Sequence, residues 1–161
     1  EAPSTKHQAR SMISLARISL IALALSTSSK ALRAQTVSVS GNPALVRIST
    51  GVAGSPPTSV SNAVTTYTVT TPNPNRTYKL TMQLNANMPT GVTLTATLAA
   101  PPSATSVGAV SLDVTARDVV TGIPRSTNST RSITYQLSAT AAAGVVANQS
   151  RTVTITVVRT S

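Results

Sequence analysis

The chain has 161 residues, a length that suits one domain together with a targeting segment. Hydrophobic residues make up 40%, but Phe, Trp and Cys are absent, so the core must be mainly aliphatic, and disulfides and thiolate metal sites are excluded. The formal net charge is +10, yet the basic residues are spread singly without interleaved aromatic residues, so we expect no nucleic-acid partner and attribute the charge to a scarcity of acids.

An apolar segment near the N-terminus has the parts of a secretory signal peptide. Met12 is followed by a largely apolar run over residues 13–25, and then by Ser, Thr and the sequence Ala-Leu-Arg-Ala. Such leaders combine a weakly positive start, an apolar region of about 7–15 residues and a small residue at the cut. We predict a start at Met12, cleavage after Ala34 with Ala31 as the second choice, and export to the periplasm, the outer surface or the medium.

The alternative for this segment is an amphipathic helix that the mature protein retains. A stable membrane span is not expected, because it would need roughly 20 apolar residues. The predicted organisation is therefore an N-terminal extension and signal peptide at 1–34, followed by one folded domain at 35–161.

The rest of the chain repeats one pattern, in which short runs alternate aliphatic with polar residues and end at Pro, Gly or Asn. Successive side chains of a strand point to opposite faces, so each run predicts a strand with one buried face. The polar stretch 125–130 is predicted to be a loop. In chain order, strands are expected within 36–40, 44–48, 63–71, 77–84, 92–98, 110–114, 133–139 and 151–158, with a short edge piece and turn at 117–124.

The clearest pair of runs lies between Thr77 and Leu98. The first run alternates Tyr, Leu, Met and Leu with polar residues, and the second alternates Val, Leu, Ala and Leu with three Thr. Their connector, 85–91, contains Asn, Pro and Gly, the residues that turns need. We therefore predict that the two runs fold on each other as a hairpin.

Seven or eight short strands with no helical segment after the leader predict an all-β domain. Loops of uneven length favour a Greek-key β-sandwich over a barrel. The three tyrosines, Tyr67, Tyr78 and Tyr135, fall at inward positions of this pattern, which removes them from any sugar-stacking surface.

The sequence offers little for catalysis or for metal binding. His7, the one histidine, precedes Met12, and no Cys, His or Glu follows the leader, so histidine-based triads, zinc sites and paired-glutamate hydrolysis are excluded. Asp113 and Asp118 are expected to be solvated surface carboxylates. A weak calcium site that uses both is the open alternative. We predict no enzyme activity and no cofactor.

Two rows of threonine alternate with inward residues on separate runs. Thr is a good strand former with a neutral hydroxyl, so a soluble β-surface explains both rows. The alternative is a regular hydroxyl array that binds ice or a crystalline carbohydrate, which requires a flat, exposed sheet. The residues of this candidate binding face are Thr93, Thr95, Thr97, Thr152, Thr154 and Thr156.

Residues 36–40 of the first predicted strand and residues 152–158 of the last contain no charge and no proline. Native sheets usually protect exposed edges with such residues. The two strands either pair within the sandwich or offer edges to an added strand, a recognition mode that is common in assembly.

Thr/Val-alternating strands, small-residue loops and a terminal TVTITV strand over Thr36–Arg159 resemble small exported bacterial immunoglobulin-like domains. They are more distantly similar to spore-coat and chaperone–usher fibre subunits, although the cysteines common in those subunits are missing. The resemblance implies a secreted or cell-surface structural module, without catalysis, that assembles into fibres or takes part in adhesion. Its partners would be further copies of itself, surface glycans or other surface proteins. The alternative is a module that binds carbohydrate or ice.

Overall fold

The computed structural model describes residues 34–42, 47–48 and 55–160. The predicted leader, Met12 and His7 therefore lie outside the described residues, as does most of the strand expected at 44–48. Within the described part, the elements are nine β-strands and one short 3₁₀ turn. They are β1 (Thr36–Ser40), β2 (Val60–Thr71), β3 (Tyr78–Leu84), β4 (Val92–Leu98), β5 (Thr105–Ser106), β6 (Val110–Ser111), β7 (Arg117–Ile123), β8 (Ser126–Ala139), η1 (Ala141–Ala143) and β9 (Val153–Arg159).

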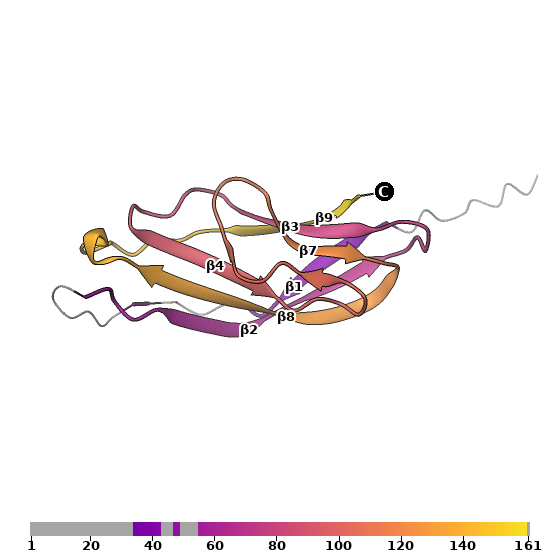
Figure 1. The fold of residues 1–161 in the computed structure, drawn as a ribbon, viewed down its shortest axis with the longest axis horizontal. Helices are drawn as coiled ribbons and strands as arrows, with labels where there is room; N and C mark the ends of the chain where they lie inside the picture. Colours follow the sequence, from indigo (N-terminus) through magenta and orange to yellow (C-terminus); the bar gives the residue numbers. More distant parts are fainter. Residues whose placement is uncertain (1–33, 43–46, 49–54, 161) are drawn as a thin grey trace, which may run out of the picture. The chain divides into compact units, whose positions relative to one another are not determined.

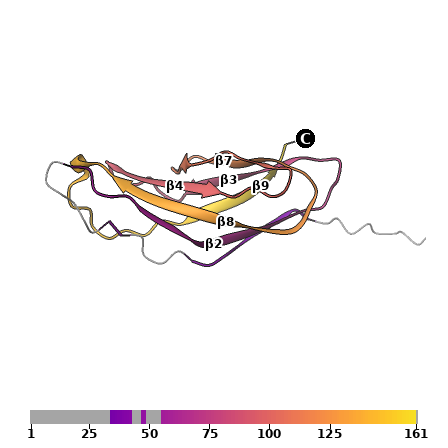
Figure 2. The same cartoon turned by 60° about the horizontal axis from the view of Figure 1, so that its bottom comes forward.

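The strands form two antiparallel sheets, which confirms the all-β prediction. Sheet A has five strands in the order β1-β2-β8-β4-β6, and sheet B has four in the order β5-β7-β3-β9. Figures 1 and 2 show the two sheets as facing layers, with β2 and β8 in one and β3, β7 and β9 in the other. All of these elements belong to one compact unit, Leu32–Ser161.

The core lies between the sheets and follows from the alternation of the strands. In β3, the inward residues Leu80, Met82 and Leu84 are at most 2% exposed, and the register places them opposite inward residues of β9. Tyr67, Tyr78 and Tyr135 are 0%, 3% and 6% exposed, so the prediction that the tyrosines face inward is confirmed. Aliphatic residues supply nearly all of the remaining core volume.

The predicted hairpin between β3 and β4 is wrong. β3 pairs with β7 and β9 in sheet B, whereas β4 pairs with β8 and β6 in sheet A. The connector 85–91 is long enough to cross between the layers instead of making a tight turn. Its ends are held by separate bonds, from Asn85 N to Thr152 O (3.0 Å) and from Val92 N to Pro89 O (2.9 Å).

Three further expectations need correction. The described part of the chain has nine strands instead of seven or eight: β5 lies where no strand was expected, and β6 covers only the first two residues of the strand expected at 110–114. The stretch 117–124 is not an edge piece, since β7 lies between β5 and β3. The stretch 125–130 is not a loop, because β8 begins at Ser126 and pairs with β2 at Ser126, Ser129 and Thr130, with a register shift between the first two of these pairs.

Candidate interaction surfaces

The two sides of the sandwich differ in how their edge strands are built. On one side the edges are β5 and β6, which have two residues each. On the other side they are β1, with five residues, and β9, with seven. Very short edge strands expose few backbone groups with which an incoming strand can pair, whereas long uncharged edge strands expose many. The side with β1 and β9 is therefore the candidate edge.

The backbone groups on the free side of β9 can be assigned from its pairing with β3. Asn85 N donates to Thr152 O, and Thr160 N donates to Thr77 O at 2.9 Å, so the even-numbered residues of β9 exchange bonds with β3. In an antiparallel pair the intervening residues direct their backbone groups away from the partner. The amides and carbonyls of Val153, Ile155 and Val157 consequently face the free edge.

Part of this edge is covered, because β1 lies close to β9 and one hydrogen bond joins the start of this region to β9. Gln35, just before β1, donates from Nε2 to Val157 O at 3.2 Å. Val157 is also the most buried of the three inward residues, at 9% exposed. Val153 and Ile155 pack against the core but remain half-buried. The inward side of β9 is thus buried at Val157 and half-buried at Val153 and Ile155.

The structure places the two predicted threonine rows on different sheets. Thr93, Thr95 and Thr97 belong to β4 of sheet A, whereas Thr154 and Thr156 belong to β9 of sheet B, and Thr152 precedes β9. The rows therefore lie on separate outer faces and do not form one array. All three residues of the second row are exposed, and in the first row Thr93 is exposed while the other two are half-buried.

The row on β4 is one part of a larger uncharged face. Apart from two register shifts between β2 and β8, paired residues of neighbouring strands in sheet A face the same side, and none of the outward residues is charged. Thr68 and Thr130 share a hydroxyl hydrogen bond of 2.8 Å, and Thr70 Oγ1 donates to Asn128 Oδ1 at 3.0 Å. The outward residues are Thr36, Ser38, Ser40, Ser61, Thr66, Thr68, Thr70, Thr93, Thr95, Thr97, Ser111, Asn128, Thr130, Ser132, Thr134, Gln136 and Ser138.

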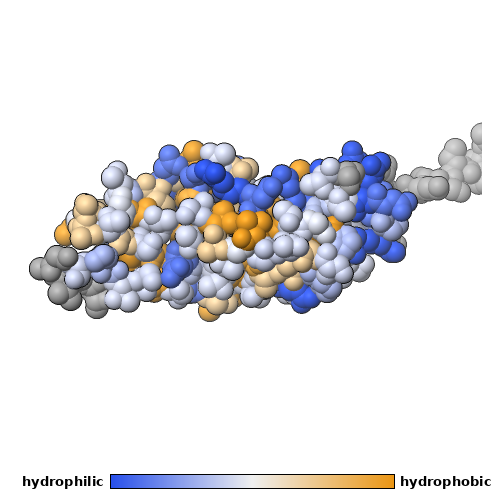
Figure 3. Space-filling view, in the orientation of Figure 1, coloured by the Kyte–Doolittle hydropathy of each residue, from blue (hydrophilic) through white to orange (hydrophobic). Residues whose placement is uncertain are grey.

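The outer face of sheet B is different, because it carries charge. Lys79 of β3 and Asp118 of β7 form an ion pair with an N–O distance of 2.8 Å beside Thr81. The face drawn in Figure 3 is mostly pale, and many of its most hydrophilic residues gather at the end of the domain where Figure 1 places the C-terminus. The uncharged character is thus a property of sheet A and not of the whole surface.

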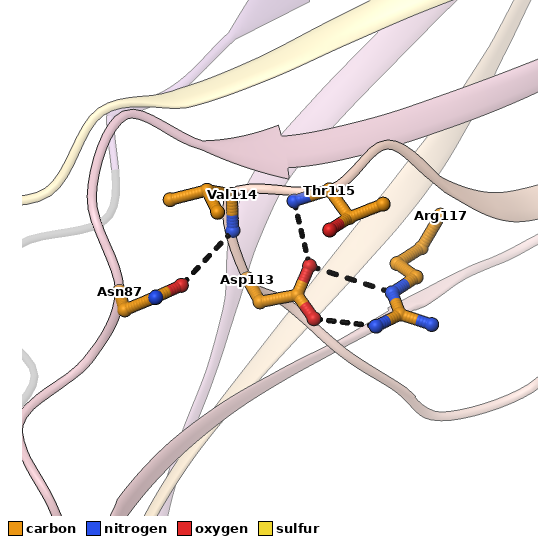
Figure 4. A network of polar contacts seen from close by, with 5 residues as sticks. All are labelled: Asn87, Asp113, Val114, Thr115 and Arg117. Carbon is orange, nitrogen blue, oxygen red and sulfur yellow. Dashed lines mark hydrogen bonds and ion pairs between the residues drawn. The ribbon is translucent and has the colours of Figure 1, made fainter.

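The two aspartates are engaged with protein groups. Asp113 accepts from Arg117 Nη2 at 2.5 Å and from Thr115 N at 2.7 Å, and Asn87 binds the next amide, Val114 N (Figure 4). The hydrogen bond from Arg117 is the largest cause that holds the pKa of Asp113 below its ordinary value. Asp118 is paired with Lys79 instead, so the carboxylates face different cations.

No group of three metal-binding side chains occurs among the residues that the structure describes. In the same part of the chain, no helix is long and apolar enough to cross a membrane.

Sequence reasoning identified both terminal strands but missed the difference in length between the edge strands of the two sides. It also missed the recess between Arg125 and Arg131. No family model, curated protein or solved structure matches this chain.

Proposed function

We propose that the chain is a non-catalytic structural or interaction module that assembles with further copies of itself by strand pairing at β9. The observation that carries this proposal is the seven-residue β9 at the edge of sheet B, with inward-facing Val153 and Ile155 half-buried and their backbone groups directed away from β3. Strand addition uses such backbone groups for affinity and the adjoining pockets for selectivity.

The strand order supports the same proposal. In a constant-type immunoglobulin sandwich, one sheet holds strands A, B, E and D, and the other holds C, F and G. β1, β2, β8 and β4 follow the first order, and β3 and β9 take the places of C and F. We propose an immunoglobulin-like Greek key on this basis. The place of strand G, beside β9, has no strand among the described residues.

An added strand at this place would pair with the free backbone groups of β9 and would cover the half-buried side chains of Val153 and Ile155. If β9 of two copies pairs around a two-fold axis, the assembly closes as a dimer, whereas an unlike pairing of β9 with β1 continues as a fibre. β1 suits the second geometry because it also lies at an edge and carries Val39, which is 50% exposed at an inward position. A fibre subunit is therefore the form of the proposal that both edges favour.

Two neighbouring lysine substitutions test the proposal. Val153→Lys places a charge on the inward side of the edge, which native sheets use to block strand addition. Thr154→Lys adds the same charge on the outer face of the same strand. We expect the wild type and Thr154→Lys to associate as concentration rises, and Val153→Lys to stay monomeric, when each is measured by sedimentation velocity and examined by electron microscopy.

Folding of the variants is checked by circular dichroism, and the half-buried position of Val153 lets a lysine extend its charged end to water. A wild type that stays strictly monomeric at high concentration and forms no fibres would refute the assembly proposal. Equal association of the two lysine variants would remove β9 as its site.

A second candidate function rests on the outer face of sheet A. Its uncharged hydroxyl and amide groups extend across five strands, which suits a repeating neutral surface such as ice or a crystalline carbohydrate. Sheets are normally twisted, and the bonds between Thr68, Thr130 and their neighbours already occupy some hydroxyls, so this function ranks behind assembly. We also propose that the domain acts outside the cytoplasm, after signal-peptide cleavage near Ala34.

A further inference from the structure

The basic residues of the described chain greatly outnumber the acids that can pair with them. Asp113 and Asp118 are the acidic residues in this part, and they are taken by Arg117 and Lys79. Arg125 and Arg131 therefore have no carboxylate partner among the described residues. Both line one recess of about 410 Å³, which runs beside the first half of β8.

The recess is polar and contains no acid. Pro102, from the segment that follows β4, also lines it, and Ser126, Thr127 and Ser129 are the hydroxyl-bearing residues of its lining that do not belong to the outer-face hydrogen bond between Thr68 and Thr130. Arginine matches the geometry of planar oxyanions, and hydroxyl side chains can bind the hydroxyls of a sugar.

Arg131 is held in place before any ligand arrives. Its Nε donates to Ala100 O at 3.1 Å and its Nη1 donates to Thr130 O at 3.2 Å, which leaves Nη2 without a protein partner among the described residues. In the register Arg131 lies opposite Tyr67, whose hydroxyl donates to the neighbouring Ala99 O at 2.6 Å. Burial raises the pKa of Tyr67 to about 12, and the nearby Arg131 charge partly offsets that rise.

Arg125 approaches from the turn between β7 and β8, so the two cations come from different structural elements. Its guanidinium makes no hydrogen bond or ion pair within the described part of the chain, and the residue is exposed. A fixed arginine and a second, unengaged arginine on the rim of one polar recess form an arrangement that attracts an oxyanion.

We infer that the recess between Arg125 and Arg131 binds the oxyanion of an acidic sugar residue, with the neighbouring hydroxyls contacting the sugar ring. The site lies apart from the β9 edge and does not depend on assembly. It gives a surface module a selective contact with an anionic glycan, whereas the face of sheet A is neutral and would not select for charge.

The test is a titration of the full chain, followed by NMR of the backbone amides of residues 125–131. Sodium glucuronate is the probe, glucose is the neutral control, and sodium sulfate supplies the anion without the sugar. We expect saturable shifts with glucuronate in the millimolar range, weaker shifts with sulfate and none with glucose.

Three variants identify the site. Arg125→Gln and Arg131→Gln should each weaken glucuronate binding roughly tenfold, the low end for loss of a hydrogen bond to a charged group. Arg151→Gln is the matched control, because Arg151 Nε also donates to a backbone carbonyl, Asn87 O, at 3.1 Å, near the opposite end of β3. It should leave the affinity within about twofold, since a distant surface charge is largely screened.

Each outcome decides the inference. No saturable shift with glucuronate, or equal shifts with glucose, would overturn the oxyanion site. Equal affinity for sulfate and glucuronate would overturn the assignment to a sugar. Equal losses in Arg151→Gln and Arg125→Gln would show a general charge effect and overturn the location. The Arg125 side chain makes no hydrogen bond or ion pair with the described residues, so Arg125→Gln should not disturb the fold. This variant therefore still tests the site if Arg131→Gln fails to fold.

Discussion

Two buried threonines lie on β2, and we expect the same substitution to stabilise the protein at one of them and to destabilise it at the other. Thr65 is 1% exposed, and its Oγ1 has no hydrogen-bond partner among the described residues. Thr71 is 0% exposed, and its hydroxyl donates to Pro124 O at 2.6 Å and accepts from Ser126 N at 2.8 Å. Valine has nearly the shape of threonine and is an equally good strand residue, so the hydroxyl is what each substitution removes.

The expected magnitudes follow from those partners. A buried hydroxyl without a partner costs about 1–3 kcal/mol, so Thr65→Val should raise the free energy of unfolding by about 1 kcal/mol. Thr71→Val should lower it by about 2–3 kcal/mol, because it breaks two bonds and leaves a carbonyl and an amide unpaired near the start of β8. The difference between the two variants is therefore about 3–4 kcal/mol.

Urea unfolding measures both variants. The midpoint should move up for Thr65→Val and down for Thr71→Val while the slope of the free energy against urea stays constant, since neither substitution changes the surface exposed on unfolding. A destabilised Thr65→Val, or equal shifts of the two midpoints, would refute the argument that an unpaired hydroxyl distinguishes these sites.

The remaining predictions concern the neutral face and the leader. If the outer face of sheet A binds ice or crystalline carbohydrate, Thr95→Lys should abolish that binding, and Thr154→Lys, on the other sheet, should leave it unchanged. Ice-growth and polysaccharide pull-down assays measure the binding. Unchanged binding in both variants would refute the assignment of a binding site to this face. The intact mass of the exported protein should correspond to a chain that begins at Gln35, and a mass that begins at Glu1 or Met12 would refute cleavage near Ala34.

Alternation predicted which side chains are buried but not which strands pair. Leu80 and Ala96 were assigned to inward positions, and both are fully buried, yet β3 and β4 lie in different sheets. A period of two fixes the face of a residue relative to its own strand. The choice of neighbouring strand depends on how long connectors cross the layers, and this is a property of the whole fold.

The first half of β8 was missed for a different reason. Residues 126–131 contain no aliphatic side chain, so the hydrophobic signal for a strand is absent there. Backbone pairing with β2 and polar contacts such as the bond between Thr68 and Thr130 hold this part in the sheet. The same lack of apolar residues leaves the Arg125–Arg131 recess polar, so the failure of the prediction and the candidate oxyanion site have one cause.

The edge strand β9 was predicted in part from the sequence. The absence of charge and proline in 152–158 pointed to this strand, but an uncharged alternating run is equally typical of a central strand. Only the strand order distinguishes the two cases, because among the described strands it pairs β9 with β3, and the register directs the backbone groups of Val153 and Ile155 away from β3. A lysine at position 153 and a lysine at position 154 differ by one residue in sequence, but the register places them on opposite sides of that strand, and the assembly experiment depends on this difference.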